Sequence, residues 1–191
     1  MTTLHFANAR LIDPEAGTDA PGSLTVKDGL ILSRDEKAPK GATLVDCGGK
    51  CLAPGIVDWG VKIGEPGERH RESFGSAGQA AAAGGVTTII ARPDTAPAID
   101  TPETLEFVTR RAAEAPVRIR HMDALTKGRE GREMTEIGFL RDAGAIAFTD
   151  VFKVSTEAKA ITRAMSYARS LGALVVGHPQ DPGLSSGASA T

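Results

Sequence analysis

The sequence predicts an α/β fold, namely an incomplete (β/α)8 barrel of about five βα units that follows a small β region. Four apolar, strand-like runs begin at Val86, Val117, Ala145 and Ala173, which places them 31, 28 and 28 residues apart. Helix-like segments fill the gaps, and this alternation is typical of a parallel sheet. Units that are so closely and regularly spaced favour a barrel over an open sheet.

Residues 1–52 are expected to form the small β domain. Strand-like runs separated by turn residues span 4–12, 23–26, 30–32 and 42–46. Asp28-Gly29 is typical of a two-residue hairpin turn, because both residue types tolerate positive φ. We therefore expect a β-meander in this region.

Residues 53–191 carry the strand–helix units. Asp100-Thr101-Pro102-Glu103 indicates a helix start, with a capping side chain, proline in the first turn and an acidic residue after it. A later helix is expected to open at Ser155 or Thr156 and to end at Leu171-Gly172. The barrel region thus holds about 140 residues, whereas a complete barrel takes roughly 200 to 250. We therefore expect a truncated, N-terminal part of a barrel.

Composition excludes several functional classes. The formal net charge is −2 and aromatic residues make up 4% of the 191 residues, so neither a nucleic-acid partner nor an anionic membrane surface is indicated. The N-terminus lacks the pattern of a signal peptide, and no apolar run approaches the roughly 18 residues that span a bilayer. Cys47 and Cys51 lack a second pair of ligands for a zinc site. A cytoplasmic protein is expected.

Chemistry in such a barrel lies at the carboxyl ends of the strands. The segments to inspect are therefore 58–62, 92–95, 121–126, 149–152 and 177–181. His178 ends an apolar strand and is a candidate metal ligand, although a structural, hydrogen-bonded histidine is the preferred interpretation. The same interpretation is preferred for His121, which follows the strand at Val117 and has no evident partner.

Several segments at these strand ends resemble dihydroorotases of the amidohydrolase superfamily, in register from about residue 4 to 184. They are Ala53-Pro54-Gly55-Ile56-Val57-Asp58, Glu65-Pro66-Gly67, Ala82-Ala83-Gly84-Gly85-Val86-Thr87-Thr88, Thr126-Lys127-Gly128, Gly144-Ala145-Ile146-Ala147-Phe148-Thr149-Asp150 and His178-Pro179-Gln180-Asp181-Pro182. The resemblance implies a barrel of the metal-dependent hydrolase type. It also implies that residues 1–52 are the N-terminal half of a flanking β-sandwich.

The resemblance further implies a role in pyrimidine biosynthesis, where the family interconverts carbamoyl aspartate and dihydroorotate. Active members use zinc held by imidazoles to activate a hydroxide, with a carboxylate as general acid and base. A His-x-His metal pair follows the first barrel strand in these members. Here the corresponding residues are Gly60, which offers no ligand, and Lys62, whose ammonium would repel a divalent cation.

Other positions with a chemical role in the family are also altered. The arginine that binds the substrate carboxylate corresponds to Gly64, and the substrate asparagine corresponds to Asp94, whose negative charge would repel a carboxylate substrate. An Asp-Asp pair has become Asp150-Val151, and the sequence leaves open which of the two normally binds the metal. Only His178 remains at a metal-histidine position. No catalytic residue is assigned, and no cofactor is expected.

Two hypotheses remain. The first is a non-catalytic homologue, most like the dihydroorotase-like chains that support aspartate carbamoyltransferase, which would be an oligomer when full length. The second is an active dihydroorotase or a related cyclic-amide hydrolase, such as an allantoinase or hydantoinase, with an altered metal centre. In the first hypothesis Lys62 could replace the charge of the lost metal and pair with Asp150 or another acid across the barrel mouth.

Overall fold

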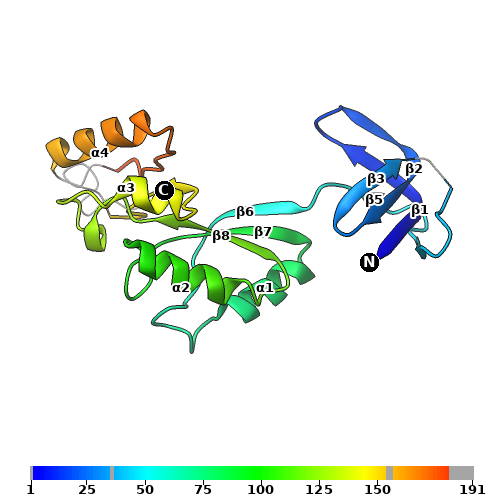
Figure 1. Ribbon diagram of the computed structural model, residues 1–191, viewed down its shortest axis with the longest axis horizontal. Coiled ribbons are helices and arrows are strands. Elements are labelled where there is room, and N and C mark those ends of the chain that lie inside the picture. Colours follow the sequence, from blue (N-terminus) through cyan, green and yellow to red (C-terminus); the bar gives the residue numbers. More distant parts are fainter. Residues whose placement is uncertain (1, 35–36, 154–156, 181–191) are drawn as a thin grey trace, which may run out of the picture. The chain divides into compact units, whose positions relative to one another are not determined.

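A computed structural model describes residues 2–34, 37–153 and 157–180 (Figure 1). The chain divides into two compact units, Met1–Gly55 and Ile56–Thr191. This division falls three residues after the boundary expected from the sequence.

The first unit is a five-stranded sheet made of β1 (Thr3–Asp13), β2 (Thr18–Lys27), β3 (Leu30–Arg34), β4 (Thr43–Asp46) and β5 (Cys51–Leu52). The strand order is β3-β2-β1-β4, and β5 also pairs with β1. The hairpin prediction is confirmed, since Lys27 pairs with Leu30 and both turn residues, Asp28 and Gly29, have positive φ. The β-sandwich is not confirmed, because the described residues supply one layer and a sandwich needs a second sheet against it.

The second unit alternates strands and helices in chain order. Its elements are β6 (Ile56–Val61), α1 (Phe74–Ala83), β7 (Val86–Ala91), α2 (Pro102–Ala112), β8 (Arg118–Asp123), the short η1 (Lys127–Arg129), α3 (Ile137–Asp142), β9 (Ala147–Phe148) and α4 (Ala158–Ser170). The strands form a parallel sheet in the order β6-β7-β8-β9. This is a half-barrel, as the spacing of the apolar runs predicts.

The count of five βα units is not confirmed. The run expected as a fifth strand forms an isolated parallel bridge, Phe148 to Val175, rather than a named strand. Two backbone hydrogen bonds hold it, from Phe148 N to Leu174 O at 2.8 Å and from Val176 N to Phe148 O at 2.9 Å. Because β9 itself has only two residues, it offers little backbone for a longer ladder.

The helix boundaries follow local sequence chemistry. The Thr101 hydroxyl accepts a hydrogen bond from Thr104 N at 3.3 Å and so caps α2, which begins at Pro102 as predicted. Helix α4 ends where expected, with Leu171 as its C-cap and Gly172 at a φ of +65°. The expected start of that helix at Ser155 or Thr156 lies outside the described residues.

Side chains alternate across the sheet of the second unit. Ile89, Ala91 and Ile119 belong to the main core, which also contains buried residues of α1 and α2. Figure 1 shows these two helices along one side of β6 to β8. Ile90, Met122 and Ala147 form a separate, smaller cluster. Since successive side chains of a strand point to opposite faces, this second cluster lies on the face that a closed barrel would enclose.

Candidate functional site

The carboxyl ends of β6, β7, β8 and β9 lie at one edge of the parallel sheet, which we call the mouth of the half-barrel. Gly60 lies in the last part of β6, and Lys62, Gly64, Asp94 and Asp150 lie in the segments that follow β6, β7 and β9. His178 follows the isolated bridge at Val175.

Gly60 lies at an irregularity in β6. Trp59 pairs with Ile90 and Val61 pairs with Ala91, so Gly60 is the extra residue of a bulge, with a φ of +85°. No atom lies within 4 Å of the place where a β-carbon would stand. Space is therefore available, but an L side chain such as histidine would be strained in this backbone conformation.

Lys62 pairs with a residue of its own loop. Its Nζ lies 3.4 Å from the Glu68 Oε2, and Glu68 also pairs with Arg71. The hypothesis that Lys62 pairs with Asp150 across the mouth is wrong, because Glu68 is closer along the chain and Asp150 is occupied elsewhere. The Lys62 ammonium is half-exposed and does not stand in for a metal ion among carboxylates.

Gly64 is buried where the loop after β6 folds back on itself. The Glu68 N–H donates to the Gly64 carbonyl oxygen at 2.6 Å. A β-carbon on Gly64 would lie 2.5 Å from the Glu68 carbonyl oxygen and 3.0 Å from that of Glu72. The backbone of this loop therefore excludes the arginine that the family resemblance places at this position.

Asp94 is held by its neighbour Arg92. The guanidinium donates from Nε to Oδ1 at 3.1 Å and from Nη2 to Oδ2 at 2.8 Å. Both side chains are largely buried, so this bidentate pair compensates the charge of Asp94. The repulsion of a carboxylate substrate by Asp94 stays a prediction, and the pair with Arg92 would weaken that repulsion.

Asp150 clamps the loop that follows β8. Its Oδ1 accepts from the backbone N–H groups of Leu125 and Thr126 at 3.1 and 3.0 Å, and its Oδ2 accepts from the Thr126 hydroxyl at 2.7 Å. The Thr126 oxygen in turn accepts from Gly131 N at 2.8 Å. Asp150 is thus committed to backbone structure between two strand ends.

We expect Asp150→Asn to lower the free energy of unfolding by about 1.5 kcal/mol, because the new amide cannot accept the Thr126 hydroxyl proton at the same position. Urea denaturation measures this difference. The exposed Asp142, which pairs with the neighbouring Arg141, supplies the matched control Asp142→Asn, expected within about 0.5 kcal/mol of the unaltered protein. Equal stability of the two variants would contradict a stabilising role for the Asp150 hydrogen bonds to the loop after β8.

His178 is exposed at the mouth. Its Nε2 lies 3.0 Å from the Gln180 Oε1, and its ring meets that of Phe152 edge to face at 5.4 Å. Among the described residues, no three His, Cys, Asp or Glu side chains are grouped so that they could hold a metal ion. At the positions that the family resemblance assigns to the metal, the chain has Gly60 with a positive φ, Lys62 paired with Glu68, Asp150 bound to the loop after β8, and His178 in contact with Gln180. These residues do not fit a zinc centre.

A cavity of about 240 Å³ opens at the mouth. Its lining comes from the ends of β6, β7, β8 and β9 and from the segment after the Val175 bridge, and it includes three aromatic or imidazole rings; the residues are Trp59, Gly60, Arg92, Met122, Thr149, Val151, Phe152, Val176, Gly177 and His178. A neighbouring cavity of about 250 Å³ shares Val151, Val176, Gly177 and His178 with it. The half-barrel therefore has a cavity at the expected place, and Gly60 stands in its lining where the family resemblance expects a metal-binding histidine.

Two buried titratable groups lie on β8: the sequence analysis named His121 but missed Asp123, and its interpretation of His121 as a hydrogen-bonded histidine is wrong. His121 and Asp123 have exposed fractions of 2% and 0%. Neither ring nitrogen of His121 and neither carboxylate oxygen of Asp123 has a hydrogen-bond partner in the described part of the chain. Burial lowers the pKa of His121 to about 4; burial, with a contribution from Asp100, raises the pKa of Asp123 to about 8. Both groups are therefore predominantly uncharged at neutral pH.

These two groups belong to the helix-facing side of the sheet and not to the mouth. They alternate with Met122, and the His121 ring meets the Phe74 ring of α1 edge to face at 5.7 Å. No cavity is lined by them among those at the mouth. The alternation of Ile119, His121 and Asp123 in the sequence was the available indication that they share one face.

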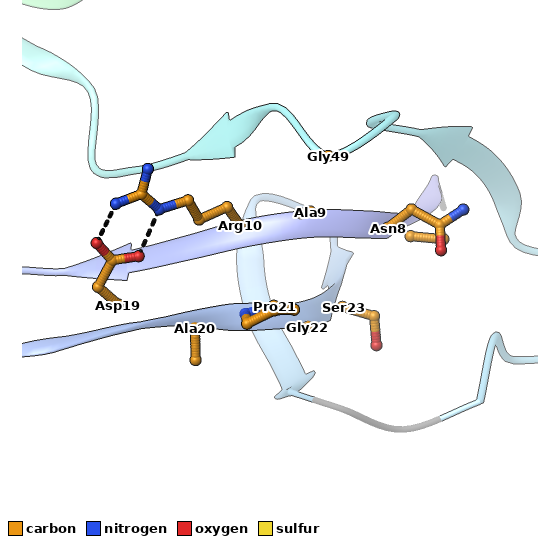
Figure 2. A pocket seen from close by; sticks show the side chains of 10 residues that line it. Asn8, Ala9, Arg10, Asp19, Ala20, Pro21, Gly22, Ser23 and Gly49 are labelled. Carbon is orange, nitrogen blue, oxygen red and sulfur yellow. Dashed lines mark hydrogen bonds and ion pairs between the residues drawn. The ribbon is translucent and has the colours of Figure 1, made fainter.

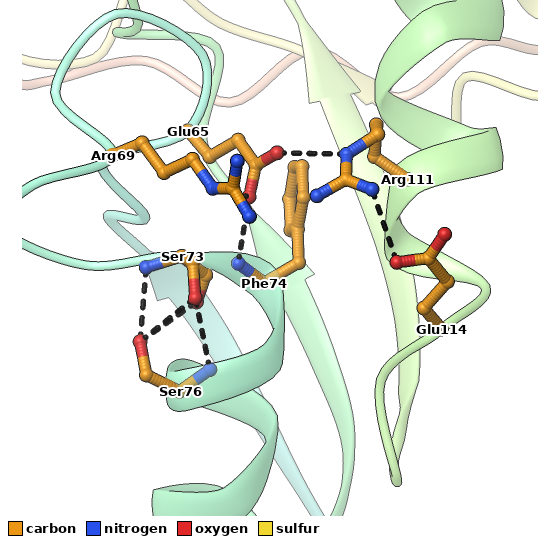
Figure 3. Close-up of polar contacts among 7 residues, drawn as sticks. All are labelled: Glu65, Arg69, Ser73, Phe74, Ser76, Arg111 and Glu114. Carbon is orange, nitrogen blue, oxygen red and sulfur yellow. Dashed lines mark hydrogen bonds and ion pairs between the residues drawn. The ribbon is translucent and has the colours of Figure 1, made fainter.

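Glu65, in the loop after β6, is the centre of a buried polar cluster (Figure 3). Its Oε1 accepts from the Arg111 Nε at 2.9 Å, and its Oε2 accepts from Phe74 N, at the start of α1, at 3.2 Å. The Arg69 Nε lies 3.9 Å from the same Oε2. Glu65 therefore joins the mouth loop to both α1 and α2.

The first unit holds a groove of about 920 Å³, lined mainly by small residues at the bulge of β1 (Figure 2). Arg10 donates two hydrogen bonds to Asp19, at 2.6 and 2.5 Å, and this contact lowers the pKa of the carboxyl. These two are the charged residues of the lining, and each neutralises the other. The groove thus presents a small-residue surface and no catalytic arrangement.

In the part of the chain that the structure describes, no helix is long and apolar enough to cross a membrane.

Comparison with known proteins identifies relatives. Residues 49–191 match the protein family described as Dihydro-orotase-like. The dihydroorotase of Pelobacter propionicus is 37% identical over 181 residues, which cover 93% of this chain and 43% of that protein. The dihydroorotase of Anaplasma phagocytophilum is 39% identical over 193 residues, with coverage of 97% and 43%. The chain thus spans about 43% of the length of these relatives.

Solved structures share the fold. The L-hydantoinase (dihydropyrimidinase) from Arthrobacter aurescens superposes with a TM-score of 0.77 at 23% identity, covering 93% of this chain and 41% of that one. A dihydroorotase crystal structure superposes with a TM-score of 0.65 at 13% identity, with coverage of 95% and 52%. At these identities the likeness establishes the fold alone.

Proposed function

Because the chain belongs to the Dihydro-orotase-like family, we propose that it is a non-catalytic dihydroorotase homologue of pyrimidine biosynthesis. The observation that carries this proposal is the pair of residues at the His-x-His positions. Gly60 has no side chain and a positive φ, and Lys62 is paired with Glu68. Neither residue can supply the neutral imidazole nitrogen that a zinc ion needs.

The remaining mouth residues support the same proposal. Asp150 uses both carboxylate oxygens to hold the loop after β8. Gly64 leaves no room for a carboxylate-binding arginine, and Asp94 is neutralised by Arg92. In active relatives the metal would supply an activated hydroxide for attack on a cyclic amide. The part of the chain that the structure describes offers neither a group of ligands for that metal nor, at Gly64 and Asp94, the usual anchors for the substrate carboxylate.

Metal content and turnover test the proposal directly. We expect the chain, purified with zinc in the medium, to contain substoichiometric zinc by elemental analysis and to show no conversion of carbamoyl aspartate or dihydroorotate above buffer. The dihydroorotase of Pelobacter propionicus serves as the control for both assays. Stoichiometric zinc together with turnover would overturn the proposal. That result would favour the alternative of a cyclic-amide hydrolase with an altered metal centre.

We also propose that the protein supports aspartate carbamoyltransferase as a structural partner and acts as an oligomer when full length. An exposed apolar edge strand is consistent with such an interface, since Leu30, Ile31 and Leu32 of β3 are all exposed. Co-expression of the two proteins, followed by affinity purification and light scattering, tests the pairing. Separate elution, with neither protein changing the thermal stability of the other, would contradict it.

A further inference from the structure

Asp123 is a buried carboxyl group that the core leaves without a partner. Its exposed fraction is 0%, and neither of its carboxyl oxygens has a hydrogen-bond partner in the described part of the chain. Since the described residues already exclude water from it, further chain packed against this unit would not uncover it. A buried polar group without a partner costs stability, so its presence calls for an explanation other than packing.

The backbone that follows Asp123 joins two loops. The Ala124 N–H donates to the Ile99 carbonyl oxygen at 2.7 Å, which ties the loop before α2 to the end of β8. The Gly128 N–H donates to the Asp100 Oδ2 at 2.8 Å, which ties the same loop to η1. These two hydrogen bonds, which we call the latch, hold the loop before α2 against the loop after β8.

Asp100 also acts on Asp123 through its charge. Burial, with a contribution from Asp100, raises the pKa of Asp123 to about 8. A carboxylate that accepts one of the latch hydrogen bonds therefore repels the ionised form of the buried carboxyl group. The latch and the proton on Asp123 are thus coupled through Asp100.

The described residues around Asp123 supply no cation that lowers its pKa. His121, on the same face of β8, carries no charge in the range in which Asp123 ionises, because burial lowers its pKa to about 4. Charged groups on the surrounding elements have partners of their own: they are Arg92 (with Asp94), Arg111 (with Glu65), Lys127 (with Glu133), Arg129 (with the Asp150 carbonyl oxygen) and Asp150 (with the N–H groups of Leu125 and Thr126). An ionised Asp123 can therefore be stabilised only by water.

We propose that Asp123 is the proton switch of this latch: the two loops stay joined while Asp123 is protonated and separate when it loses its proton to solvent. Ionisation places in the core a charge that repels Asp100, and separation of the loops lets water reach it. The backbone of η1 favours release, because Gly128 and Arg129 both have a φ of +57°, a strained conformation for arginine. The switch goes beyond the proposed function and does not depend on it, since it involves no metal and no substrate.

Amide hydrogen exchange of the full chain, followed residue by residue by NMR in low concentrations of urea, measures the latch directly. The Ala124 and Gly128 amides report on the latch, and the amide of Val108, a fully buried residue of α2, reports on global unfolding. We expect the latch amides to exchange through an opening with a lower free energy and a smaller urea slope than that of Val108. Between pH 6.5 and 8 their protection, corrected for the intrinsic pH dependence of exchange, should fall about fifteenfold.

Three variants locate the switch. Asp123→Asn should keep the protection of Ala124 and Gly128 constant between pH 6.5 and 8, because asparagine has no proton to lose in this range. Asp100→Asn keeps an oxygen that can accept from Gly128 N but removes the charge beside Asp123, so the fall in protection should be smaller. Asp58→Asn, at an exposed position of β6, is the matched control and should show the full fall.

Three outcomes would overturn the inference. Equal free energies and urea slopes for the latch amides and Val108 would mean that the loops separate only when the whole chain unfolds. Constant protection of the latch amides in the unaltered protein, or an equally steep fall in Asp123→Asn, would remove Asp123 as the switch. The zinc and turnover assays are independent of these measurements, so failure of the latch leaves the proposed loss of catalysis standing.

Discussion

Replacing Glu65 by alanine should lower the free energy of unfolding by about 3 kcal/mol. The Glu65 carboxylate is buried, at 5% exposure, and accepts hydrogen bonds from the Arg111 Nε and from Phe74 N (Figure 3). Its loss leaves the guanidinium without its buried partner and removes an acceptor at the positive end of α1. The measurement is urea denaturation at neutral pH, followed by circular dichroism.

Glu114 provides a control on the same guanidinium. It pairs with the Arg111 Nη1 at 3.0 Å, but its side chain is 71% exposed. Glu114→Ala should therefore cost no more than about 0.5 kcal/mol, as is usual for exposed ion pairs. Similar losses in both variants would show that burial of Glu65 does not set the strength of its contacts.

Replacing Asp123 by asparagine should stabilise the protein, and the gain should depend on pH. The Asp123 pKa is raised to about 8 by burial, with a contribution from Asp100, whereas an unfolded aspartate titrates near 3.9. Between these values the folded state keeps a proton that the unfolded state has lost. Stability therefore falls as pH rises through this window, and it reaches its lowest level above pH 8. Asparagine carries no charge and removes this cost.

His121 acts with the opposite sign at lower pH. Burial lowers its pKa to about 4, so between pH 4 and about 6.5 the unfolded state holds the additional proton, and stability rises with pH. The two contributions offset one another in that range. The decline due to Asp123 should therefore be visible between about pH 6.5 and 8, where it amounts to roughly 2 kcal/mol for the unaltered protein.

The pH series separates these contributions. Urea denaturation at pH 6.5 and 8 should show Asp123→Asn more stable than the unaltered protein by an amount on the order of 5 kcal/mol at pH 8, and by roughly 3 kcal/mol at pH 6.5. Asp58→Asn, at an exposed position of β6, should keep the original pH dependence. A stability of Asp123→Asn that declines from pH 6.5 to 8 as steeply as that of the unaltered protein would exclude Asp123 as the source.

Much of the fold could be predicted because its determinants are local. The Asp28-Gly29 turn, the Thr101 cap with Pro102, and the stop at Gly172 each depend on residues within one turn of the chain. The fifth strand could not be predicted in this way. Its length depends on how much of β9 is available for pairing, and β9 has two residues.

The candidate site likewise has some features that the sequence predicts and others that only the fold decides. That Gly60 and Lys62 cannot bind zinc follows from their side-chain chemistry and needed no coordinates. The folding of the loops after β6 and β7 decides two ion pairs that the sequence did not predict. Lys62 pairs with Glu68, and Asp94 pairs with Arg92. The fold also decides that an arginine cannot stand at Gly64. The loop brings the Glu68 carbonyl oxygen to 2.5 Å from the place where a β-carbon of residue 64 would lie.

The sequence by itself determined the family and the order of strands and helices in the half-barrel, because periodicity and turn residues act over short stretches of chain. It also showed that Gly60 and Lys62 offer no imidazole. The tertiary structure alone decided which charges are buried and what they contact. Glu65 meets Arg111 across 46 residues, and Asp123 becomes a neutral acid only because the surrounding core removes water from it. Burial and long-range contacts set these electrostatic energies, and neither is encoded at a single position.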